Sequence, residues 1–217
     1  MALTAGLAVH ADTLFSNTNA TSTFGFSSGG NGNQIGSQVG LADDGYGAIL
    51  TGFSFELYAR NVDSSLASYT ISLYANDGAT VNGYASPSTE LWTSSYTFGT
   101  ADLSTGMLVS YGSSDLNSVQ VPSTFTWVIS FSDLGSGDAG VNYTAENPAV
   151  GGLYSDVWVN DGAGWGLDVA EDGSNINFLS SFEGTVLTTP EPSSIALLSL
   201  GSASLLFWRR RSARCSK

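Results

Sequence analysis

The chain has 217 residues, of which 26 are glycine, and its 19 acidic and six basic residues give a formal net charge of −13 at pH 7. Residues 12–189 hold 18 of the acids and one basic residue, Arg60, so their formal charge is 1 − 18 = −17. A body of this charge repels nucleic acid and anionic lipid, so the composition excludes a nucleic-acid partner.

The first eleven residues predict a signal-peptide remnant. Met1–Val9 is short and apolar, and Val9-His10-Ala11 is a small-x-small cleavage site that would leave Asp12 as the first mature residue. The segment has no basic n-region. An ordinary first strand therefore stays open as the alternative.

Residues 12–187 are predicted to form one exported all-β domain. Glycine, serine, threonine and asparagine separate short alternating runs, and no segment before residue 193 keeps a helical period. The clearest strands are expected at 49–58, 69–75 and 125–131. Shorter strands are expected at 38–41, 90–96, 119–121, 156–160 and 176–186, the last one broken near Ser180.

Period-two alternation assigns faces to the three clearest strands. The residues expected in the core are Phe53, Phe55 and Leu57, then Tyr69, Ile71 and Leu73, then Phe125, Trp127, Ile129 and Phe131. Ser54, Glu56 and Tyr58 are expected to face solvent. Asn76-Asp77-Gly78 is typical of a turn, and Pro122 suits the entrance to the third strand.

The connections are too short for crossover helices, so the strands must pair mainly antiparallel. About eight to ten strands in two stacked sheets of jelly-roll type bury the aromatic residues best, with a single barrel as the alternative.

Three acidic turns supply oxygen atoms that suit calcium: Asp43-Asp44-Gly45, Asn160-Asp161-Gly162 and Glu171-Asp172-Gly173-Ser174-Asn175. None has the spacing of an EF-hand. Asp-Gly and Asn-Asp-Gly are also the preferred chemistry of ordinary turns, so no metal site is predicted.

The best candidate surface for a glycan holds three aromatic residues, Tyr154, Trp158 and Trp165. They lie among Asp156, Asn160, Asp161 and Asp168 in a glycine-rich stretch where loops and sheet edges are expected. The alternative is that Trp158 and Trp165 are half-buried packing residues.

The residues that are missing restrict the chemistry. If the signal is cleaved after Ala11, the exported domain has no histidine, cysteine or lysine, because only His10, Cys215 and Lys217 supply them. Nucleophilic triads, thiolate or imidazole zinc sites and lysine Schiff bases are thereby excluded. A non-enzymatic protein without a cofactor is expected, and a carboxylate-dependent glycan hydrolase is the enzyme alternative.

The end of the chain, residues 188–217, is predicted to be a separate membrane-associated segment. Pro190-Glu191-Pro192 stops any helix from running back into the domain, and residues 193–208 carry no charge. Sixteen helical residues span roughly 24 Å against a hydrocarbon core of about 30 Å. The residues expected to form this membrane helix are Ser193, Ile195, Leu197, Leu198, Leu200, Leu205, Leu206, Phe207 and Trp208. A buried core helix is the alternative.

A basic cluster follows the helix and consists of Arg209, Arg210, Arg211 and Arg214. By the positive-inside rule, residues 209–217 are cytoplasmic and everything before the helix is exported. Cys215 in this tail is interpreted as incidental.

The Pro-Glu-Pro triplet, the short apolar helix and the arginine cluster together resemble the PEP-CTERM sorting signal of exported proteins in Gram-negative bacteria that make exopolysaccharide. The resemblance implies recognition by an exosortase, a membrane cysteine protease that acts near Pro190-Glu191-Pro192. It further implies a transient stay in the inner membrane, N-terminus out and C-terminus in, before arrival at the cell surface or in the extracellular matrix.

Much of the body resembles a sandwich domain often found ahead of such tails. The resemblance rests on 34–39, 50–56, 73–78 and 121–127, and it implies no catalytic residues. We therefore expect an exported β-sandwich that is structural or associated with extracellular polysaccharide. The alternatives are the hydrolase and a calcium-stiffened adhesin.

Overall fold

The computed structural model describes residues 11–18, 24–27, 31–42, 45–62, 65–98, 106–169 and 175–187. Contacts divide the chain into residues 1–187 and residues 188–217, and the second unit lies outside the described part. Except for Ala11, the predicted signal-peptide remnant lies outside it as well.

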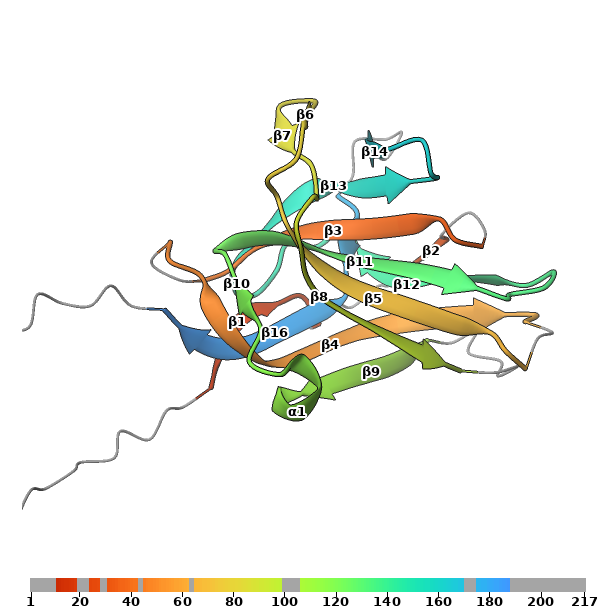
Figure 1. Cartoon of the computed structure of the whole chain (residues 1–217), viewed down its shortest axis with the longest axis horizontal. Coiled ribbons are helices and arrows are strands. Elements are labelled where there is room, and N and C mark those ends of the chain that lie inside the picture. The colour runs from red at the N-terminus through yellow and green to blue at the C-terminus, as the bar shows by residue number, and fades with distance from the viewer. Residues whose placement is uncertain are drawn as a thin grey trace, which may run out of the picture. The chain divides into compact units, whose positions relative to one another are not determined.

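The described residues form sixteen β-strands and one short helix (Figure 1). In chain order they are β1 (Asp12–Ser16), β2 (Phe24–Ser27), β3 (Gln34–Gly40), β4 (Ala48–Arg60), β5 (Ser68–Ala75), β6 (Thr80–Val81), β7 (Tyr84–Ala85), β8 (Glu90–Thr97), β9 (Met107–Gly112), α1 (Ser113–Leu116), β10 (Gln120–Val121), β11 (Thr124–Ser132), β12 (Asp138–Thr144), β13 (Gly152–Asn160), β14 (Trp165–Asp168), β15 (Asn177–Phe178) and β16 (Ser180–Val186).

These strands build two stacked antiparallel sheets. The first sheet runs β1-β16-β4-β12-β15, and β9 and β10 pair with β4 while β2 pairs with β12. The second runs β14-β13-β3-β11-β5-β8, and β6 and β7 form a separate small hairpin. Because the chain passes repeatedly from one sheet to the other, the structure confirms the all-β, jelly-roll-like sandwich.

Aromatic side chains fill the space between the sheets. All ten residues that alternation assigned to the core are buried. Phe53 on β4 stacks on Phe182 of β16 at 4.4 Å between ring centroids, and it meets Trp127 of the opposite sheet edge-on at 5.5 Å. Offset and edge-to-face arrangements are the favoured geometries of aromatic pairs. The two sheets are therefore joined through ring contacts.

The expectation that Tyr58 faces solvent is wrong. Only 3% of its surface is exposed, although it alternates with the core residues of β4. A Cβ atom built on Gly25 would lie 2.8 Å from the Tyr58 ring, and one on Gly140 would lie 2.8 Å from its hydroxyl. Two neighbouring glycines thus make room for the ring on the outer face, and the guanidinium carbon of Arg60 lies 4.9 Å from the ring centroid.

More strands form than the eight to ten expected. Four of them, β6, β7, β10 and β15, are two-residue ladders, and β1, β2, β9, β12 and β14 were not predicted. The expected break near Ser180 is confirmed, because β15 ends at Phe178 and β16 begins at Ser180.

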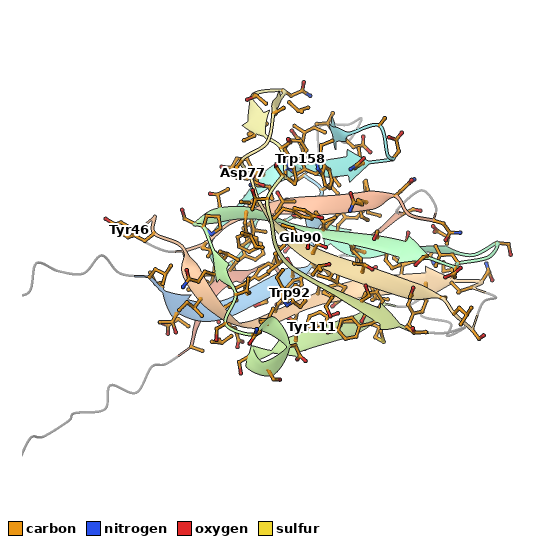
Figure 2. All side chains as sticks on the ribbon, viewed as in Figure 1. Tyr46, Asp77, Glu90, Trp92, Tyr111 and Trp158 are labelled. Carbon is orange, nitrogen blue, oxygen red and sulfur yellow. The ribbon has the colours of Figure 1, made fainter. Side chains whose placement is uncertain are left out.

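The predicted turn at residues 76–78 anchors the excursion that carries the β6–β7 hairpin (Figure 2). The Asp77 carboxylate accepts hydrogen bonds from the Thr89 backbone N–H at 2.9 Å and from the Thr89 hydroxyl at 2.6 Å. These bonds favour the charged form and lower the pKa of Asp77. The hydrogen bonds between Asp77 and Thr89 therefore hold together the two ends of the segment that contains the β6–β7 hairpin.

Replacing Phe53 with alanine should reduce the free energy of unfolding by about 3–5 kcal/mol, because it removes a buried ring that touches both sheets. Tyr46→Ala is the matched control, since Tyr46 is 53% exposed (Figure 2), and it should stay within about 0.5 kcal/mol of the parent. Denaturant unfolding followed by circular dichroism measures both, and equal effects would contradict the proposed role of Phe53.

Two tyrosines should make the domain sensitive to alkali. Burial, followed by the charge of Asp138, raises the pKa of Tyr58 to about 12, and burial and the Tyr69 hydroxyl raise the pKa of Tyr111. A raised folded-state pKa contributes stability that is complete below the unfolded value of 10.0 and is lost as the pH rises toward the folded value.

Tyrosinate absorbance and circular dichroism, recorded together, test this effect. Part of the absorbance of the nine tyrosines should appear only as the structure is lost, and Tyr58→Phe should flatten the loss of stability between pH 10 and pH 12. Titration of all nine near pH 10 in a protein that stays folded would contradict it.

Candidate functional site

The predicted sorting and membrane residues lie outside the described part of the chain. They are Pro190, Glu191 and Pro192, the helix expected at 193–208, and the basic cluster Arg209, Arg210, Arg211 and Arg214. Within the described ranges, no helix has the length and apolar character that a membrane crossing requires.

The three aromatic residues of the predicted glycan surface do not form one exposed platform. Trp158 is only 1% exposed and its indole N–H donates to the Gln38 side-chain oxygen at 3.2 Å, so its ring has no face open for stacking. The prediction is wrong for this residue. Trp165 is partly exposed and lies edge-on to Trp158 at 6.4 Å, whereas partly exposed Tyr154 contacts Tyr84 at 5.4 Å.

The burial of Trp158 follows from its position in the sheet. Trp158 and Asn160 lie on the outer face of β13, and Trp165 of β14 pairs directly with Asn160. Tyr74 on β5 contacts the Trp165 ring at 6.3 Å. Trp165 therefore packs on Trp158 over the second sheet, and Tyr74 packs on Trp165 in turn.

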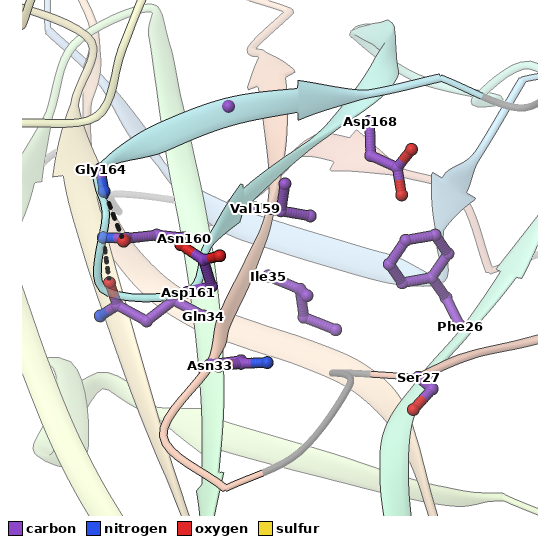
Figure 3. A pocket seen from close by; sticks show the side chains of 11 residues that line it. Phe26, Ser27, Asn33, Gln34, Ile35, Val159, Asn160, Asp161, Gly164 and Asp168 are labelled. Atoms are coloured by element: carbon purple, nitrogen blue, oxygen red, sulfur yellow. Dashed lines mark hydrogen bonds between the residues drawn. The ribbon is translucent and has the colours of Figure 1, made fainter.

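The opposite side of the same hairpin lines a pocket of about 380 Å³. The pocket lies between β2 of the first sheet and β3, β13 and β14 of the second (Figure 3). Its lining residues are Phe26, Ser27, Asn33, Gln34, Ile35, Val159, Asn160, Asp161, Gly164, Gly166 and Asp168. The volume is within the range of about 300–1,000 Å³ that is usual for small-ligand sites.

The pocket combines an apolar floor with a polar rim. Ile35, Val159 and the ring of Phe26 supply the apolar surface, and the Asp168 carboxylate points toward this ring from β14 (Figure 3). Phe26 is itself held by Phe178 at 5.7 Å and by Tyr143 at 6.2 Å. The floor is therefore continuous with the aromatic core.

The turn between β13 and β14 fixes the amide side of the rim. The Asn160 side-chain oxygen accepts the backbone N–H groups of Gly162 at 2.9 Å and Gly164 at 3.3 Å. Its amide donates to Gln34 at 3.1 Å, and Figure 3 shows the bonds to Gly164 and Gln34. Gly162 and Gly164 have φ values of +98° and +123°, which glycine adopts without strain.

The same turn contains Asn160-Asp161-Gly162, one of the three acidic turns whose oxygen atoms suit calcium. One carboxylate oxygen of Asp161 accepts the Ala163 N–H at 3.0 Å, as expected of an ordinary Asx turn. The described residues contain no group of three or more His, Cys, Asp or Glu side chains that could hold a metal ion. Of the other two acidic turns, Asp43, Asp44 and 171–174 lie outside the described residues.

Two polar side chains of the rim are unengaged. Within the described ranges, the side chains of Asn33 and Asp168 form no hydrogen bond or ion pair, whereas the Ser27 hydroxyl donates to the Asp138 carboxylate at 2.5 Å. That carboxylate also accepts the Tyr58 hydroxyl at 3.4 Å. Hydrogen bonds therefore fix Ser27 in one wall of the pocket, whereas the side chains of Asn33 and Asp168 are available to bond a ligand.

Sequence reasoning identified Asn160, Asp161 and Asp168 but missed Phe26, Asn33 and Gln34. The run Phe24-Gly25-Phe26-Ser27 does alternate, and this was the available signal. Its length of four residues is too short to distinguish a strand from a loop by pattern alone.

Comparison with protein families matches residues 188–211 to the PEP-CTERM protein-sorting motif. This match confirms the motif predicted from Pro190-Glu191-Pro192 and the residues that follow. No curated protein and no solved structure matches the chain significantly. The motif marks an exported protein that passes through the membrane and is processed by an exosortase.

Proposed function

We propose that this exosortase-sorted protein reaches the cell surface or extracellular matrix and there holds polysaccharide non-catalytically through its β-sandwich. The observation that carries the proposal is the pocket between β2 and the β13–β14 hairpin, in which an aromatic floor meets amide and carboxylate groups. The sorting motif at 188–211 supports the destination.

The chemistry of this pocket suits a sugar ring. A pyranose has an apolar C–H face and a rim of hydroxyl groups that both donate and accept hydrogen bonds. Phe26 offers an apolar surface to the C–H face of the sugar. Asn33 and Asp168 offer an amide and a carboxylate to its hydroxyl groups.

The negative charge of the pocket and of the whole domain limits the kind of glycan that can bind. Asp161 and Asp168 both line the pocket, and residues 12–189 carry a formal charge of 1 − 18 = −17. Uronic acids and sulfated sugars would be repelled, so a neutral or amino sugar is the expected ligand.

A glycan hydrolase is the second candidate, because two carboxylates line one pocket and glycosidases work with such a pair. Asp161 is, however, partly engaged by the Ala163 N–H, which leaves Asp168 as the one fully available carboxylate. Release of reducing ends from the host's exopolysaccharide would establish hydrolysis, and binding without release supports retention.

The proposed sorting to the cell surface is tested by measuring the intact mass and the location of the protein in its native host. The surface form should end near Pro190 when the exosortase is present, and it should be absent from a strain without the enzyme. Changing Pro190, Glu191 and Pro192 together to alanine should abolish processing, whereas Ser216→Ala should not. A full-length membrane form in both strains would instead make 193–208 a permanent anchor.

The proposed binding of polysaccharide in the pocket is tested with polysaccharide purified from the producing host. Asp168→Asn and Asn33→Ala should each weaken binding about tenfold, which corresponds to about 1.4 kcal/mol per lost interaction. Asp133→Asn is the matched control, because it removes one exposed charge outside the pocket and should leave binding unchanged. Equal affinity of all variants, with unchanged melting temperatures, would exclude this pocket.

A further inference from the structure

Strand β8 forms a long edge of the second sheet. It runs for eight residues, pairs with β5 along one side, and has no strand partner on its other side among the described residues (Figure 1). The opposite edge of this sheet, β14, has only four residues. Long free edges are templates for pairing with another chain, and most proteins shorten or protect them.

The pairing of β8 with β5 is irregular at Leu91, where the register shifts by one residue, but from Trp92 onward the strand is regular and lacks the usual protective features. After Glu90 its sequence is Leu-Trp-Thr-Ser-Ser-Tyr-Thr, without a charge, a proline or a glycine. Lysine, proline and inward-pointing charges are the common means of blocking an edge strand. In a body with 18 acids, this stretch of seven uncharged strand residues brings no like charges into direct contact with a second strand.

The free side of β8 presents backbone groups in a fixed geometry. The Phe98 N–H points toward β5, where it donates to the Ala67 carbonyl at 2.9 Å. Because backbone direction alternates along a strand, the N–H and C=O groups of Thr93, Ser95 and Thr97 point away from β5.

Side chains on both faces hold β8 in this extended form. On the outer face, Ser95 is 2.7 Å from the Thr70 hydroxyl and Thr93 is 2.8 Å from the Ser72 hydroxyl. On the inner face, Trp92 and Tyr96 contact the Tyr111 ring at 5.7 Å and 5.1 Å. The strand is thus ordered before any partner arrives, which lowers the entropy cost of pairing.

The neighbouring edge of the first sheet adds apolar surface. Tyr111 belongs to β9, which pairs only with β4 among the described strands, and its sequence Met-Leu-Val-Ser-Tyr-Gly is also uncharged. Leu108 on β9 is 61% exposed. A chain that pairs with β8 would therefore approach an uncharged and partly apolar side of the sandwich.

We propose that β8 pairs antiparallel with β8 of a second copy of this chain, so that two sandwiches share one continuous sheet. An antiparallel strand pair is self-complementary about a two-fold axis, so a second copy fits without any further matching surface. The outward groups of Thr93, Ser95 and Thr97 meet when Ser95 lies opposite Ser95 of the second copy. In this register each Glu90 lies five residues from the two-fold axis, so the two Glu90 residues are about 34 Å apart at roughly 3.4 Å per residue. This exceeds the screening length of about 8 Å at physiological ionic strength, so their mutual repulsion is small.

Cross-linking of the full-length protein, expressed at the surface of its native host, tests this pairing. Cys215 is the only cysteine, so a Cys215→Ser background accepts a single new thiol. Ser95→Cys, treated with a short bifunctional thiol reagent, should give a covalent dimer. Thr13→Cys is the matched control, because Thr13 is an exposed threonine on the edge strand β1 of the other sheet, and it should give at least tenfold less dimer.

A second pair of variants tests whether the backbone edge makes the contact. Thr97→Cys, treated with a longer bifunctional reagent that spans about 15 Å, should also give the dimer. Adding Ser95→Pro should reduce it at least tenfold, because proline removes an outward N–H but no backbone bond to β5. Adding Thr93→Lys in place of the proline should have the same effect without any backbone change. No dimer from Ser95→Cys, equal dimer from Thr13→Cys, or dimer that persists in both blocked variants would overturn the proposal.

Discussion

The ring contacts between the sheets are the interaction on which the rest of the structure depends. Phe53, Phe182 and Trp127 join β4 and β16 to β11, and each buried aromatic ring removes about 150–250 Å² from water. Buried leucine, isoleucine and valine side chains fill the rest of the core around these rings. The same aromatic layer continues through Phe178 to Phe26 and becomes the floor of the pocket.

Sequence patterns predicted the fold where alternation is strong and uninterrupted. Strands β5 and β11, and β4 from Phe53 to Leu57, carry a large apolar residue at every second position, and each strand was located correctly. Strand β12 has the sequence Asp-Ala-Gly-Val-Asn-Tyr-Thr. Its small and polar residues obscure the alternation of inward and outward positions, although Ala139 and Val141 are in the core. Such strands are defined by the sheets that surround them, so local sequence does not identify them.

The two parts of the candidate function differ in how far sequence could predict them. The sorting motif is contiguous, and its order of prolines, apolar run and arginines is readable without a fold. The pocket joins Phe26 and Asn33 to Asp168, which pairing between distant strands brings together. Trp158 shows the same limit, because its burial depends on Gln38, Trp165 and the register of β13 on β3.

The separation of charge along the chain connects these parts. The acidic body is repelled by anionic lipid, whereas five of the six basic residues lie in the last nine positions, so membrane association rests on the residues after the domain. Processing by an exosortase would remove that association. The net charge of a domain released in this way attracts no anionic surface, so its proposed retention rests on local contacts. The pocket, with its aromatic floor and its amide and carboxylate groups, and the uncharged edge of β8 are the surfaces proposed to make them.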